Sequence, residues 1–101
     1  MNPYDRAARL LQHFRALEVL LERERAQEWL RPIAEIVKAL EPPFSDVRQC
    51  LETIEEAKRR FDSWHKSKGG FSEFYVHRED FKERLAANNE LEAIRKAIYQ
   101  G

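Results

Sequence analysis

The sequence predicts an all-α protein, a small bundle of four or five helices. Apolar residues recur at alternating spacings of three and four over long stretches, which is typical of helices with one buried face. Prolines and glycines gather at a few points, where helices are expected to end. The 101 residues fit one domain, 1–101, and a 43% hydrophobic share is enough to build a core.

The first helix is expected to begin at the N-terminus. Asn2 is a good N-cap, and Pro3 at the first helical position loses nothing by lacking a backbone donor. The apolar face is Ala7, Leu10, Phe14, Leu17 and Leu21. A break is expected within residues 25–28, because Pro32 is tolerated only in the first turn of a new helix.

The second and third helices meet at a proline pair. Pro42 and Pro43 end the second helix, whose apolar face is Leu30, Ile33, Val37 and Leu40. Ser45 is the expected N-cap of the third helix. Its apolar face is Val47, Cys50, Ile54, Ala57, Phe61 and Trp64. The lone cysteine lies on this face and is interpreted as a small core residue.

A Gly-Gly turn and a short aromatic segment precede the last helical region. Gly69 and Gly70 are expected to stop the third helix, and residues 71–76 to form a packed irregular segment with at most one helical turn. The last helical region begins around residues 78–80, with Phe81 on its buried side. Asn88 and Asn89 are candidates for an interruption of this helix.

Enzymatic chemistry is not predicted. His65 and His77 lack the close spacing of metal ligands, and Cys50 lies on an apolar face. The double glycine follows a helix, whereas a phosphate-binding loop opens one. We therefore expect no metal, no cofactor and no catalytic set.

Nucleic-acid binding is the alternative function. A basic cluster ends the third helix: Lys58, Arg59, Arg60, Lys66 and Lys68. The eighteen basic and eighteen acidic residues cancel, however, and cations late in a helix also complement its dipole. Glu55 with Arg59 and Glu56 with Arg60 are further expected to form ion pairs along the helix.

Protein recognition is the favoured function. Aromatic residues and arginine dominate interface energetics, and the stretch after the third helix is rich in them. The candidate contact surface is Trp64, His65, Phe71, Phe74, Tyr75, His77 and Arg78. The competing interpretation is that these rings complete the core, which is favoured for Phe61, Trp64 and Phe81 because they lie on helical apolar faces.

Three short motifs carry a resemblance. A tryptophan and a leucine open one helix, a Gly-rich turn leads into an aromatic box, and an asparagine precedes leucine, isoleucine and tyrosine. These are Trp29, Leu30, Gly69, Gly70, Phe71, Ser72, Glu73, Phe74, Asn88 or Asn89, Leu91, Ile94 and Tyr99. In them the chain resembles a family of small uncharacterised bacterial helical proteins, a domain of unknown function. The resemblance implies a bacterial source and a helical fold and supplies no activity.

We therefore expect a non-catalytic protein-binding module, an immunity-type or regulatory partner of a bacterial protein. That role is an analogy with other small bacterial helical proteins. No apolar run approaches the ~18 residues of a membrane span, and the first residues lack the apolar core of a signal peptide, so the expected compartment is the cytoplasm. The identity of the partner and the oligomeric state are left open by the sequence.

Overall fold

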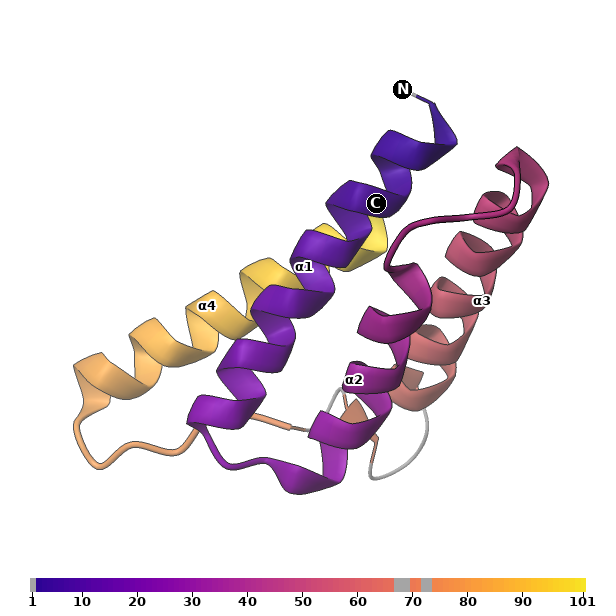
Figure 1. Ribbon diagram of the computed structural model, residues 1–101. Helices are drawn as coiled ribbons and strands as arrows, with labels where there is room; N and C mark the ends of the chain where they lie inside the picture. The colour runs from indigo at the N-terminus through magenta and orange to yellow at the C-terminus, as the bar shows by residue number, and fades with distance from the viewer. Residues whose placement is uncertain (1, 67–69, 72–73) are drawn as a thin grey trace.

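The computed structural model describes residues 2–66, 70–71 and 74–101. Within these residues the protein has four helices and no strand (Figure 1). They are α1 (Pro3–Arg23), α2 (Gln27–Leu40), α3 (Val47–Lys66) and α4 (Phe81–Gln100). The all-α prediction is confirmed. Gly69 lies outside the described residues, and so does the predicted Gly-Gly turn.

Helix α1 is the centre of the molecule. It packs against each of the other three helices, and α2 also packs against α3. The N-terminal part of α4 lies on the other side of α1 from that pair (Figure 1), whereas Tyr99 near the C-terminal end of α4 contacts Phe61 and His65 of α3. The molecule is elongated, with extents of 48 × 25 × 20 Å. As predicted, the Asn2 side chain caps α1 by accepting a hydrogen bond from the Asp5 backbone N–H at 2.9 Å.

The end of α1 is a Schellman motif that lacks the usual glycine. Arg25 takes the left-handed conformation, with φ of 57°. The Arg25 N–H donates to Glu22 O and the Ala26 N–H donates to Leu21 O. The break between the first two helices therefore falls at residues 24–26, at the start of the predicted range.

Two details of the helix starts correct the sequence prediction. Pro32 lies in the second turn of α2, because the Schellman motif releases the chain early enough for α2 to begin at Gln27. Asp46, and not Ser45, caps α3: its carboxylate accepts from the Gln49 N–H at 2.8 Å. The Gln49 side chain in turn accepts from the Ser45 N–H, so the two side chains satisfy donors on both sides of the cap.

The core is drawn from all four helices and from the segment before α4. Phe14, Phe61 and Phe71 are its largest fully buried side chains. Cys50 is buried, as predicted. Val76 is also part of the core, although it lies in no helix.

Helix α4 departs from the prediction in two ways. It runs without interruption through Asn88 and Asn89. Phe81, expected on a buried face, is 65% exposed, and Leu85 one turn later is 51% exposed. The reason is the register of the two helices. Arg23, the last residue of α1, pairs with Glu90 at 3.0 Å, so the first turns of α4 lie beyond the end of α1 and Phe81 and Leu85 stay exposed there.

No described helix combines the length and the apolar character that crossing a membrane requires.

Candidate functional site

Residues 74–80, here called the contact segment, join the core region around Phe71 to the start of α4. Exposure alternates along it: Tyr75 and His77 are exposed, Val76 between them is buried, and Phe74 and Arg78 are partly buried. A period of two is the pattern of an extended chain with one side inward. Residues 74–76 belong to no helix, in agreement with the predicted packed irregular segment, and the Phe74 N–H donates to Phe71 O at 3.1 Å.

Asn88 of α4 holds the middle of the contact segment. Its side-chain oxygen accepts from the Val76 N–H at 2.7 Å, and its side-chain nitrogen donates to Val76 O at 2.8 Å. One amide thus satisfies both backbone groups of a buried residue, as a neighbouring strand would. The same nitrogen donates to Arg84 O at 2.9 Å, which fixes the amide on its own helix.

Arg95 of α4 holds the beginning of the segment. The guanidinium group is buried and donates to Phe71 O and, at 2.8 Å, to Phe74 O. It also lies over the Phe71 ring, 4.6 Å from the centroid, a cation–π contact made stronger by desolvation. Burial lowers the pKa of Arg95, and the nearby Glu92 carboxylate opposes that effect.

Phe71 belongs to the core and not to the predicted contact surface. Its side chain is 1% exposed, with ring centroids 5.2 Å from Trp29, 5.9 Å from Phe61 and 5.6 Å from Phe74. The prediction that placed Phe71 on a surface is corrected because Arg95 ties its carbonyl inward and the ring fills the space between α2 and α3. Phe74 stacks on it and remains partly exposed.

The other end of the segment is tied to α1. Arg78 donates to the Glu24 carboxylate at 2.6 Å, and Arg23 donates to the same carboxylate at 2.8 Å. These two guanidinium groups, Arg78 first, hold the pKa of Glu24 below its ordinary value against the effect of its burial. Asn88, Arg95 and Glu24 therefore fix the contact segment at its middle and both ends.

The outward side of the segment is aromatic. Tyr75 is 54% exposed, and its ring centroid lies 4.5 Å from that of His77. A cavity of about 290 Å³ lies between the segment and the α1–α2 connection, with Tyr75 and His77 in its wall. Phe81 and Leu85 follow on the uncovered turns of α4, so four exposed ring or apolar side chains occur within residues 75–85.

Trp64 and His65 lie on α3 and are partly buried. Trp64 packs against the core. His65 stacks on Phe61 and contacts Tyr99, and its buried Nδ1 has no hydrogen-bond partner among the described residues. Burial, followed by the positive charge of Arg95, lowers the pKa of His65. The predicted surface is thus divided: of its residues, only Tyr75 and His77 are exposed.

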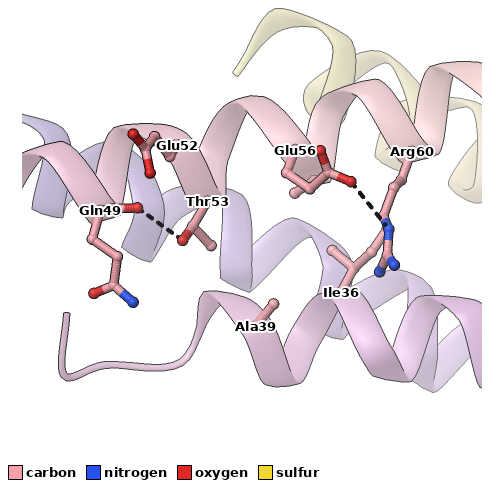
Figure 2. Close-up of a pocket in the computed structure, with 8 residues that line it drawn as sticks. Ile36, Ala39, Gln49, Glu52, Thr53, Glu56 and Arg60 are labelled. Atoms are coloured by element: carbon pink, nitrogen blue, oxygen red, sulfur yellow. Dashed lines mark hydrogen bonds and ion pairs between the residues drawn. The ribbon is translucent and has the colours of Figure 1, made fainter. Parts of the chain in front are cut away.

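The basic end of α3 is largely ion-paired. Arg59 and Arg60 share the Glu56 carboxylate, and Lys66 pairs with Asp62 at 3.2 Å. Arg59 thus pairs with Glu56 and not with the expected Glu55. Figure 2 shows the Arg60 guanidinium directed at Glu56, beside a cavity of about 230 Å³ between α2 and α3. Lys58 is partly buried, and Lys68 lies outside the described residues.

In the part of the chain that the structure describes, no three His, Cys, Asp or Glu side chains lie close enough to hold a metal ion. No family model matches the chain, and no curated protein or solved structure matches it. The helical fold that the resemblance implied is confirmed, and the bacterial source that it also implied stays a prediction.

Sequence reasoning missed the residues that position the site. Arg95 interrupts the apolar face between Leu91 and Ile98, and a charged residue at such a position is a signal of a buried polar contact. Asn88 lies on the same face, seven positions before Arg95, but in the sequence alone it resembles a helix interruption. Glu24 gave no signal, since its partner Arg78 is distant in the sequence.

Proposed function

We propose that this protein is a non-catalytic protein-binding module whose contact surface is the outward side of residues 75–85. The observation that carries the proposal is the combination of exposure and rigidity. Tyr75, His77, Phe81 and Leu85 are exposed, while the backbone beside the first two is held by partly buried hydrogen bonds at Val76 and Phe74. Large exposed side chains on a fixed backbone lose little entropy on binding, as interface hot spots require.

An immunity-type or regulatory role in the bacterial cytoplasm is the concrete form of this proposal. Such proteins act by covering a surface of a larger partner, and they need a stable fold and one adhesive face. The described fold has a core shared by four helices. The first turns of α4, which lie beyond the end of α1, carry exposed apolar side chains. The ion pairs at the basic end of α3 leave less support for nucleic-acid binding.

The experiment is a comparison of matched variants in a pull-down from the native organism, read by mass spectrometry. Tyr75→Ala combined with Phe81→Ala is expected to lose the partner by at least tenfold, about what one or two hot-spot side chains contribute. The control is Val19→Ala, which removes another exposed apolar side chain, 63% exposed, on α1. All variants should unfold at nearly the wild-type temperature, because each altered side chain is largely exposed.

Retention of the partner by the Tyr75/Phe81 double variant would contradict the proposed surface. Equal loss with Val19→Ala would contradict it as well, since the effect would then follow from any lost apolar surface.

A further inference from the structure

We propose that the contact segment binds an extended peptide of its partner by strand addition, through the backbone edge of Tyr75 and His77. This inference rests on the proposed function and specifies the partner's chemistry at the same site.

The direction of the backbone groups follows from the Asn88 contact. In an extended chain the N–H and C=O of one residue point to one side, and those of its two neighbours point to the opposite side. Both backbone groups of Val76 point to Asn88, as the bonds at 2.7 and 2.8 Å require. The corresponding groups of Tyr75 and His77 therefore point away from α4.

That edge is largely without partners. The His77 carbonyl accepts from the Arg78 guanidinium at 2.8 Å. For the Tyr75 N–H, the Tyr75 C=O and the His77 N–H there is no hydrogen bond within the part of the chain that the structure describes. Two N–H donors and one C=O acceptor thus face outward in the order found along the edge of a strand. The segment that carries them is held in place, because Arg95 binds its beginning and Glu24 binds its other end.

The main chain of an extended peptide has the matching chemistry. It offers C=O and N–H groups in the same alternation, which is how strand addition gives affinity with little dependence on sequence. A strand edge of this kind is normally covered or blocked by charge or proline, because it attracts other chains. Here the adjoining cavity of about 290 Å³ leaves space beside the segment, and the exposed Tyr75 ring can pack on an alternate side chain of the peptide.

The test uses a phage-displayed library of linear dodecapeptides selected on the wild-type protein. Affinities of the selected synthetic peptides are then measured for His77→Pro and His77→Ala. Both variants remove the imidazole, but only proline removes the N–H, for which the described residues hold no partner, and an extended Val76 suits a following proline. We expect His77→Pro to bind about tenfold more weakly than His77→Ala, or worse, since one hydrogen bond and close approach are lost.

A second measurement does not depend on the folding of any variant. N-methylation of alternate residues of the peptide blocks the donors of one edge only. Methylation in one register should abolish binding, and methylation in the other register should leave it within about twofold. Binding that tolerates both registers would overturn strand addition.

The remaining outcomes separate the two proposals. Equal affinity for His77→Pro and His77→Ala, with loss of binding in Tyr75→Ala, would overturn strand addition and leave the proposed surface intact. Failure to select any peptide above background would overturn strand addition, while the pull-down decides the surface independently. A dimer of the protein that His77→Pro dissociates would place a second copy on this edge and overturn the assignment to a partner's peptide.

Discussion

Two polar side chains on one helix face, Asn88 and Arg95, determine where the contact segment lies. Arg95 is buried and Asn88 is partly buried, and each binds backbone groups that would otherwise lack these partners. An unpaired buried carbonyl or N–H costs about 1–3 kcal/mol, so these residues stabilise the segment through satisfied hydrogen bonds more than through charge. The hydrogen bonds of two polar side chains thus determine the path of a segment that packs on the apolar core.

Replacement of Arg95 tests this role. Arg95→Met keeps much of the volume but leaves the Phe71 and Phe74 carbonyls without their donor, so we expect the free energy of unfolding to fall by about 2–4 kcal/mol. Urea denaturation provides the measurement. The control is Arg48→Met, which removes an exposed arginine paired only with Glu52 and should change stability by less than about 0.5 kcal/mol. Equal effects of the two substitutions would show that the buried bonds contribute nothing.

His65 predicts a dependence of stability on pH. Its pKa is lowered in the folded protein by burial and by Arg95, so between the folded value and the unfolded value of about 6.5 the unfolded chain binds more protons. The contribution of His65 is therefore complete above about pH 6.5 and is lost as pH falls through the folded pKa.

The measurement is urea denaturation of wild type and His65→Gln between pH 7.5 and pH 5. The stability difference between them should shrink as pH falls, because the wild type alone loses the favourable neutral imidazole. A His65→Gln profile parallel to the wild type would rule out this origin of the pH dependence.

At the scale of the elements, helix ends set the architecture. Asn2, Asp46 and Asp80 cap α1, α3 and α4 with side-chain oxygens, each accepting from the backbone N–H three residues on. The end of α1 differs, because a Schellman motif is built with Arg25 where glycine would avoid strain. This turn directs α2 back along α1 and places Glu24 where Arg78 can reach it.

Glycine at this turn should stabilise the protein. Arg25→Gly removes the strain of a left-handed residue with a side chain, partly offset by the greater backbone entropy of glycine in the unfolded chain. We expect a gain of about 0.5–1 kcal/mol and a rise of a few degrees in Tm by calorimetry. Arg25→Ala keeps a Cβ in the left-handed conformation and should give no such gain, so equal Tm values for the two variants would contradict the account.

At the scale of the whole molecule, sequence periodicity accounts for more of the fold than of the site. The three-four spacing identifies the helices, because it records which side of each helix is buried. The spacing cannot give the register between helices. Phe81 is exposed because α1 ends opposite Glu90, beyond the first turns of α4. Likewise, Asn88 resembles a helix interruption in the sequence, and only the neighbouring Val76 backbone reveals its role. Tyr75 and His77 follow no helical spacing, which is why the sequence makes them candidates for a contact surface.

The central claim is that Val76 is anchored by Asn88 while the backbone groups of Tyr75 and His77 face outward. Amide hydrogen exchange in the ¹⁵N-labelled protein measures this residue by residue. After correction for intrinsic rates, the Val76 amide should exchange at least about tenfold more slowly than those of Tyr75 and His77, and Asn88→Ala should remove that difference. Equal exchange at all three amides of the wild-type protein, or protection of Tyr75 and His77 as strong as that of Val76, would contradict the account.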